Sequence, residues 1–197
     1  MAEEWLSHRL SHKTDLERGD HDLNPGFSLN PQLRRAAVLV GLVQRPQGLC
    51  VLLTQRTNHL EHHPGQICFP GGQVEKSDQD ATATALRETT EEIGLSESHI
   101  RIVGDLDTYI TRTGFTIAPV VGLIQPPLNL CLDAFEVEDV FEMPLSFLLN
   151  AENHCKQQRE FQGQMLSFYA MPYGDYYIWG ATAGILMNLY QVLTDAP

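Results

Sequence analysis

Apolar residues near the start of the chain fall into two short runs separated by a turn. Residues 36–43 and 50–54 are almost continuously apolar, and Pro46, Gln47 and Gly48 lie between them. Runs of this length, bounded by proline and glycine, are typical of buried β-strands joined by a tight turn. The pattern therefore predicts a hairpin of two buried strands.

Helical spacing is predicted in two further places. Alanines recur within residues 79–93, Ser77 or Asp78 is a candidate N-cap, and Gly94 is a candidate C-terminal stop. These residue types begin and end helices because they satisfy the terminal backbone groups. Residues 180–193 carry apolar side chains at mostly helical spacing and are expected to form a helix that packs on the core.

The rest of the chain interleaves strands and helices. Strands are expected at residues 100–111, 115–124 and 135–143, a short helix at 144–150, and a hairpin at 159–169 that turns at Gln162, Gly163 and Gln164. Tight turns together with helices that can cover both faces indicate an α/β protein, here an α/β/α sandwich with a mixed β-sheet.

Residues 1–30 differ from the rest in being polar and rich in histidine, with a short helix expected near residues 5–16. We interpret them as an N-terminal arm or extension that could pack on a partner subunit in a homodimer. Residues 31–197 are then a single catalytic domain, since a chain of 197 residues with 43% hydrophobic content can bury a full core.

Charge and cysteine usage narrow the function classes. The net charge of −12 argues against a nucleic-acid polymer or an anionic membrane as partner, while a small anion that arrives with its metal stays acceptable. The 4 cysteines form no closely spaced pair, which favours reduced thiols. With an acidic amino terminus and no apolar run of membrane-spanning length, we expect a cytoplasmic protein.

The most informative chemistry is a set of three carboxylates on one helix. Glu88, Glu91 and Glu92 stand at i, i+3 and i+4, so their side chains emerge within one turn and repel each other. A hard dication such as Mg²⁺ or Mn²⁺ removes that repulsion and brings substrate phosphates with it. A solvated acidic face is the alternative for a Glu-rich run. The Gly71-Gly72 loop before the helix, which can bring bare backbone close to a ligand, favours the metal site.

The segment from Arg87 to Leu95, together with the preceding glycine loop and short helix, closely resembles the signature of the Nudix hydrolases. Two features depart from the general signature: the step from Gly72 to Arg87 is one residue longer, and Asp78 stands where the signature has a glutamate. The resemblance implies the α/β/α fold and cleavage of a diphosphate linkage with a bound divalent metal.

The longer spacing and residues 52–72 resemble one branch of that family, the coenzyme A diphosphatases. Leu52-Leu53-Thr54-Gln55-Arg56 and Phe69-Pro70-Gly71-Gly72 match the branch motif in register. Residues 111–122, 140–145 and 178–185 also resemble it. Thr57 replaces a smaller residue, and Glu61 stands where the branch has an arginine, which reverses a charge and puts coenzyme A itself in doubt as the preferred substrate.

Roles for the helix residues follow from the resemblance. Glu88 and Glu92, one turn apart, are expected to bind the metal chiefly, with Glu91 completing the cluster or acting on the attacking water. Arg87 is expected to orient a glutamate by pairing with Glu91 at i+4, an ordinary surface ion pair being the alternative.

Substrate contacts are expected outside the helix. Arg56 could bind a phosphate through two donors, or form a salt bridge near the loop. Gly71 or Gly72 could offer a carbonyl. Glu136 and Glu138 are candidates for a further metal ligand or base, although isolated glutamates on an acidic chain are more often solvated.

Several aromatic residues near the end of the chain are compatible with two roles. They either stack on an adenine ring or fill the space between the sheet and the last helix, and packing is favoured for Trp179. The set consists of Tyr169, Tyr173, Tyr176, Tyr177 and Trp179.

Three functions are compatible with these residues. The first is hydrolysis of coenzyme A or an acyl derivative to 3′,5′-ADP and a phosphopantetheine half, with Mg²⁺ or Mn²⁺ as cofactor. The second is a diphosphatase for another nucleoside diphosphate derivative, such as ADP-ribose or NADH. The third is a non-catalytic nucleotide sensor, against which the complete set of three glutamates and Arg87 argues.

Overall fold

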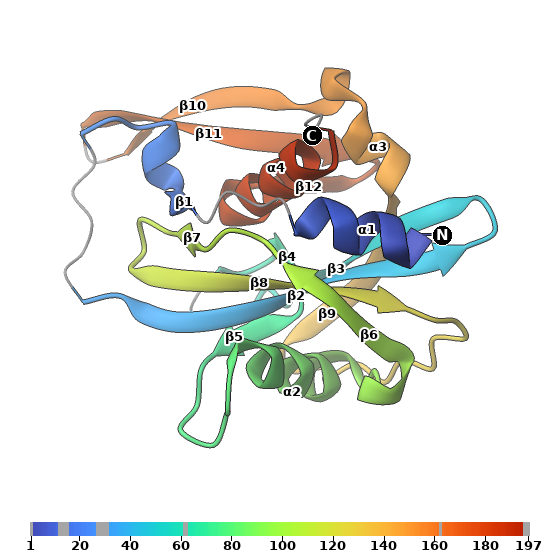
Figure 1. The fold of residues 1–197 in the computed structure, drawn as a ribbon. Helices are drawn as coiled ribbons and strands as arrows, with labels where there is room; N and C mark the ends of the chain where they lie inside the picture. Colours follow the sequence, from blue (N-terminus) through green and yellow to red (C-terminus); the bar gives the residue numbers. More distant parts are fainter. Residues whose placement is uncertain (1, 12–15, 27–31, 61–62, 162, 195–197) are drawn as a thin grey trace.

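The computed structural model describes residues 2–11, 16–26, 32–60, 63–161 and 163–194. At its centre, β2 (Arg34–Arg45) and β8 (Phe115–Ile124) run parallel, paired from Arg34 with Phe115 to Val43 with Ile124. On the other side of β2, β3 (Gly48–Arg56) is antiparallel, as the predicted hairpin requires. The sheet is therefore mixed, as predicted (Figure 1).

Shorter strands extend this sheet. On the far side of β3 lies β9 (Val137–Pro144), while β6 (Ile100–Asp105) and β7 (Tyr109–Ile110) pair with β8. The first strand, β1 (Arg18–Gly19), pairs with β7, and β4 (Ile67–Cys68) pairs with the end of β3. The glycine strand β5 (Gly71–Gln73) pairs with the start of β2, which brings the glycine loop to the middle of the sheet.

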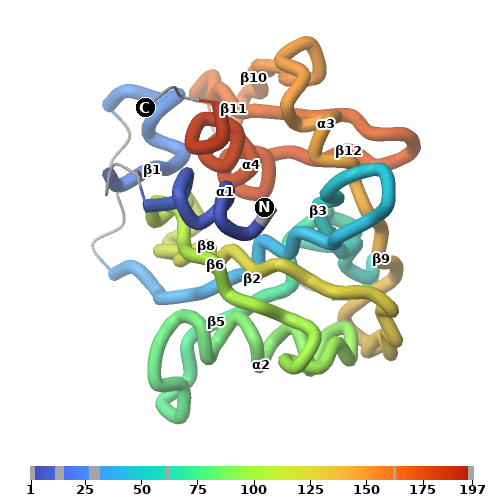
Figure 2. Tube along the Cα trace, turned by 45° about the vertical axis from the view of Figure 1, so that its right-hand side comes forward, coloured from blue at the N-terminus to red at the C-terminus, as the bar shows by residue number. Residues whose placement is uncertain are grey.

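Helices cover both faces of the sheet. Figures 1 and 2 show α2 (Ala81–Ile93) on one face and α1 (Ala2–Leu10) with α4 (Gly180–Thr194) on the other. Successive side chains of β2 point to opposite faces of the sheet and so contribute to both layers of the core. Val40 and Leu42 pack towards α4, and Leu39 packs towards α2. The expected α/β/α sandwich is confirmed.

A second, smaller sheet lies beside α4. It consists of β10 (Cys155–Phe161), β11 (Gln164–Tyr173) and β12 (Tyr176–Trp179), all antiparallel. The short helix α3 (Leu145–Leu149) leads into it after β9. The hairpin predicted at residues 159–169 is confirmed but begins earlier and ends later. Its predicted turn includes Gln162, which lies outside the described residues.

Two predicted elements are corrected. The helix expected from residue 79 begins at Ala81, and its N-cap is Asp80, whose carboxylate accepts a hydrogen bond from the Ala83 amide. Asp78 cannot cap because its carboxylate is taken by Arg87. The strand expected at residues 100–111 is interrupted after Asp105, because Asp107 turns inward to a buried position beside Arg18. The helix ends at the left-handed Gly94, as predicted.

The opening segment contributes to the core. Leu6 and Leu10 of α1 are buried against the α4 layer, and the helix begins at Ala2 and ends at Leu10 instead of spanning residues 5–16. The predicted boundary between residues 30 and 31 lies outside the described residues. Within the described ranges, no helix is both long and apolar enough to cross a membrane. All four cysteines are free thiols.

Candidate active site

The glycine strand β5 lies directly against the carboxylate face of α2. Gly71 has φ of 155°, and a Cβ on it would collide with the backbone of Ala37 and Val38. A Cβ on Gly72 would collide with the Glu88 carboxylate. Backbone conformation and neighbouring backbone atoms therefore require glycine at Gly71, whereas a side chain at Gly72 would displace the Glu88 carboxylate.

Glu92 is the most buried carboxylate of the set. Its side chain is 5% exposed, and one oxygen accepts a hydrogen bond of 3.2 Å from the Gly71 amide. Burial raises the pKa of Glu92 to about 8, and the nearby charges of Glu136 and Glu88 add to the rise. Burial also raises the pKa of Glu88. This face of α2 is thus a place where negative charge is insufficiently compensated by the protein.

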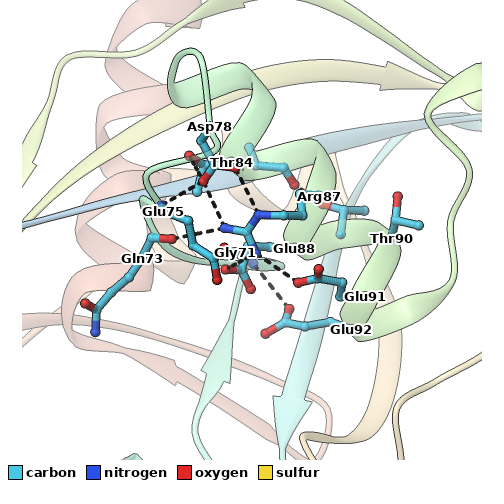
Figure 3. A network of polar contacts seen from close by, with 12 residues as sticks. Gly71, Gln73, Glu75, Asp78, Thr84, Arg87, Glu88, Thr90, Glu91 and Glu92 are labelled. Atoms are coloured by element: carbon cyan, nitrogen blue, oxygen red, sulfur yellow. Dashed lines mark hydrogen bonds and ion pairs between the residues drawn. The ribbon is translucent and has the colours of Figure 1, made fainter.

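Arg87 is held by protein groups on all sides (Figure 3). Its Nε and Nη2 donate to the two oxygens of Asp78, each at 3.0 Å. Its Nη1 donates to Glu88 and to Glu91, each at 2.9 Å, and Nη2 also donates to the Gln73 carbonyl at 3.1 Å. The predicted Arg87–Glu91 pair is confirmed, but Asp78 provides the two-pronged contact. Every N–H of this guanidinium has a protein acceptor.

The Asp78 partnership is what the sequence reading missed. Its hydrogen bonds to Arg87 hold the pKa of Asp78 well below its usual range, and they raise the pKa of Arg87. The Asp78 carboxylate also accepts hydrogen bonds from the Glu75 amide and the Thr84 hydroxyl. The signal for this partnership in the sequence is that Asp78 occupies the position of the signature glutamate.

Arg56, by contrast, is held loosely at the edge of the cluster. Its guanidinium nitrogens lie 3.9 Å from Glu92 and 4.0 Å from Glu136, and its buried Nε has no hydrogen-bond partner within the described residues. Glu136 therefore faces the cluster, and its charge raises the pKa of both Glu88 and Glu92. Glu138 is exposed, and none of the described contacts of the cluster involves it. Glu61 lies outside the described residues.

The oxygen donors on α2 and β5 fit a hard divalent cation by their chemistry. Glu88 and Glu92 present carboxylates with raised pKa values next to the Gly71-Gly72 backbone, where a dication would supply the missing positive charge. In the described part of the chain, no three acidic, histidine or cysteine side chains already converge in a metal-binding arrangement. Glu91 instead points outward, with its side chain 60% exposed, and binds Arg87.

The segment of residues 178–185 is hydrogen-bonded to the strand that precedes the glycine loop. The Thr182 hydroxyl at the start of α4 donates to the Ile67 carbonyl at 2.9 Å, just before the loop begins. The aromatic residues around it mainly pack: Tyr176 stacks on Phe141 with ring centroids 3.6 Å apart, and Trp179 meets Phe168 edge-on at 5.6 Å. The packing reading of Trp179 agrees with this contact.

Comparison with known proteins places the chain in a family. The NUDIX domain model matches residues 33–161, so the chain belongs to the Nudix family, whose members generally use divalent metals. The protein named "Uncharacterized Nudix hydrolase NudL" from Escherichia coli (strain K12) is 42% identical over 157 residues, which cover 79% of this chain and 81% of that protein. The chain is accordingly a Nudix hydrolase that acts on nucleoside diphosphate derivatives.

Two further similarities were found. NudL of Escherichia coli O139:H28 (strain E24377A / ETEC) is 41% identical over 178 residues, which cover 86% of this chain and 92% of that protein. The crystal structure of a C. elegans Ap4A hydrolase binary complex has 21% sequence identity and a TM-score of 0.49, and the match covers 56% of this chain and 80% of that one.

Proposed function

We propose that this Nudix hydrolase cleaves the diphosphate of coenzyme A or an acyl-coenzyme A, which yields 3′,5′-ADP and (acyl-)4′-phosphopantetheine. The observation that carries the proposal is the position of Arg56. This residue closes the Leu52–Arg56 branch motif at the end of β3, and its guanidinium lies 3.9 Å from Glu92 with a buried Nε that has no partner in the described structure. The Arg56 side chain is 23% exposed, so its guanidinium would be able to bind a phosphate that enters from solvent.

The metal site is proposed to be built chiefly from Glu88 and Glu92. A bound Mg²⁺ or Mn²⁺ would offset phosphate charge and activate a water for attack on phosphorus. Glu91 is proposed to complete the cluster or to act on the water, and Arg87 to position Glu88 and Glu91. Arg87 acts as a positioning residue because its N–H groups are already used by the protein.

Substrate binding is assigned to Arg56 and to the Gly71-Gly72 backbone. In the reaction, water adds to one phosphorus, the bond from that phosphorus to the bridging oxygen breaks, and the proton of the water passes to a carboxylate. Arg56 would bind the phosphate oxygens, and the missing side chains at Gly71 and Gly72 would let the phosphates approach the backbone. The reaction is proposed to take place in the cytoplasm, and a homodimer stays a prediction.

Glu61 supports a second candidate, a diphosphatase for ADP-ribose or NADH. The coenzyme A branch has an arginine at this position, and a glutamate there would repel the additional 3′-phosphate that distinguishes coenzyme A from those compounds. The two candidates share the same carboxylate chemistry and differ in the 3′-phosphate on the adenosine half and in the group linked to the other phosphate.

A substrate panel separates the candidates. The protein is incubated with Mg²⁺ or Mn²⁺ and with coenzyme A, acetyl-coenzyme A, ADP-ribose or NADH, and the products are identified by mass. Formation of 3′,5′-ADP with at least tenfold preference over ADP-ribose cleavage supports the first candidate. Turnover confined to ADP-ribose or NADH rejects coenzyme A, and turnover of none of the four rejects the proposal as a whole.

A further inference from the structure

An exposed aromatic ring stands at the turn that leads into β9. Phe135 is 65% exposed, the highest value among the large hydrophobic side chains of the described residues. Single exposed hydrophobic side chains are common on protein surfaces, so exposure alone means little. Phe135 differs from such residues because hydrogen bonds connect its turn both to the end of α2 and to the end of β3.

The turn that carries Phe135 is tied to the C-terminal end of α2. The Asp133 amide donates to the Glu92 carbonyl at 2.9 Å, and the Asp133 carboxylate accepts from the Phe135 amide at 2.9 Å. The Glu136 and Val137 amides both donate to the Asp133 carbonyl. Asp133 therefore connects the backbone at Phe135 to the residue that carries the most buried carboxylate of the site.

A second set of hydrogen bonds ties the same turn to the end of β3. The Thr57 hydroxyl donates to the Phe135 carbonyl at 2.7 Å, and the Thr57 amide donates to the Glu136 carbonyl at 3.0 Å. Thr57 directly follows Arg56, and Glu136 directly follows Phe135, while Arg56 and Glu136 lie 4.0 Å apart. Phe135 thus lies on the side of the cluster where Arg56, the proposed phosphate ligand, lies.

The ring itself has one aromatic neighbour among the described contacts. His59 lies 4.9 Å from Phe135 between ring centroids, with the two planes inclined by 58°. A tilted neighbour braces the ring without covering it, which agrees with the large exposed fraction. The result is a hydrogen-bonded turn that holds an open aromatic face near the Arg56–Glu136 pair.

We infer that the open face of Phe135, braced by His59, is a subsite that stacks the base of the nucleotide half of the substrate. The inference rests on the proposed diphosphatase function. A base and its diphosphate are separated by one ribose, so a base subsite has to lie close to the phosphate donor. Any purine presents a flat π-face, and stacking on an aromatic side chain is the usual way to hold it. The ligand class is a planar heteroaromatic base linked to a diphosphate.

Fluorescence provides a test that does not depend on turnover. In Phe135→Trp, an indole replaces the ring, and saturating AMP in the presence of Mg²⁺ is expected to quench the added fluorescence, whereas ribose 5-phosphate, which has no base, leaves it unchanged. Phe161→Trp is the matched control, because Phe161 is also an exposed phenylalanine, at 42%, on the smaller sheet. Absence of quenching in Phe135→Trp, or equal quenching in Phe161→Trp, overturns the subsite.

Steady-state kinetics test the same subsite in a second way. For Phe135→Ala, the ratio of kcat/KM for ADP-ribose to kcat/KM for phosphoribosyl diphosphate, which carries no base, is expected to fall roughly 5- to 100-fold, mainly through KM. Phe161→Ala should keep the wild-type ratio. A ratio that is unchanged in Phe135→Ala overturns the subsite even if hydrolysis is normal, whereas AMP quenching without any hydrolysis would remove the proposed diphosphatase and leave the base subsite in place.

Discussion

Two arginines approach the carboxylates of α2, and their contacts differ. Arg87 donates hydrogen bonds of 2.9 to 3.1 Å to four residues, and Asp78 alone accepts two of them. Arg56 has ion pairs of 3.9 and 4.0 Å and a side-chain contact with the Cys68 thiol, and its buried Nε has no partner in the described chain. Every N–H group of Arg87 has a protein acceptor, whereas Arg56 has at least one N–H group without one.

Arg87 therefore contributes to the structure of the site, and Arg56 is the residue proposed to bind the substrate. A buried donor without a partner costs stability, and the proposed phosphate contact of Arg56 would offset part of that cost. Arg87 instead fixes the loop carrying Gln73 and Asp78 to the helix carrying Glu88 and Glu91 (Figure 3). The expected effect of a substitution on activity or stability therefore depends on which arginine, or which carboxylate, it removes.

The largest effect is expected at Glu92, the carboxylate that Arg56 approaches. Glu92→Gln removes a charge that is proposed to bind the metal, and metal charge stabilisation is worth several kcal/mol, so kcat/KM should fall roughly 10³-fold. Glu138→Gln is the matched control, because Glu138 is exposed and none of the described contacts of the cluster involves it, so its loss should hardly change kcat/KM. Equal losses in the two variants would contradict the assignment.

Arg56→Ala tests the arginine that is proposed to bind a substrate phosphate. Loss of a charged donor to a phosphate is worth about 1.5 to 3 kcal/mol, so kcat/KM should fall roughly 10- to 100-fold. The melting temperature should hardly change, because the two ion pairs that are lost are long. Arg56→Lys should recover only part of the activity, since an ammonium lacks the two-pronged geometry. A collapse in melting temperature with normal kinetics would reverse the comparison.

Arg87→Lys tests the saturated arginine and should show the opposite balance. A lysine cannot contact Asp78, Glu88 and Gln73 together, so the melting temperature should fall and kcat/KM should drop about tenfold through mispositioned glutamates. The measurement is a thermal melt with kinetics on the same sample. Binding of AMP should be less affected than in Arg56→Ala, and an identical loss of binding in both variants would show that the two arginines do not differ in role.

The smallest effect is expected from Asp78 as the pH is lowered. Its folded pKa lies below the unfolded value of about 3.9, so its contribution to the free energy of unfolding is fully present above that value and is lost as the pH falls through the folded pKa. Asp78→Asn should therefore melt below wild type at neutral pH, with a gap that narrows under strongly acidic conditions. A gap that is constant with pH would remove Asp78 as the charged partner of Arg87.

The sequence was enough to predict the sandwich, because apolar runs such as that of β2 and the Gly94 stop are local signals. It also predicted the helix that carries Glu88, Glu91 and Glu92, because i, i+3 and i+4 spacing fixes which side chains share a face. The role of Asp78 as the partner of Arg87 was not predicted, because a loop residue nine positions before Arg87 contacts it only through tertiary folding.

The exposed ring of Phe135 was missed for a related reason. Nothing in the local pattern around residue 135 marks it as part of a site, since residues 135–143 read simply as one more strand. Its position depends on hydrogen bonds from Thr57 and Asp133, which connect β3, the turn and the end of α2. Such contacts between distant segments leave no periodic signal along the chain.

The most direct test of the account is the metal dependence of diphosphate cleavage. Protein stripped of metal by a chelator is supplied with coenzyme A, and release of 3′,5′-ADP is followed as Mg²⁺ or Mn²⁺ is titrated back. The account predicts no product without metal and a rate that rises with the metal to saturation. Release of 3′,5′-ADP at an unchanged rate in the presence of the chelator would contradict it.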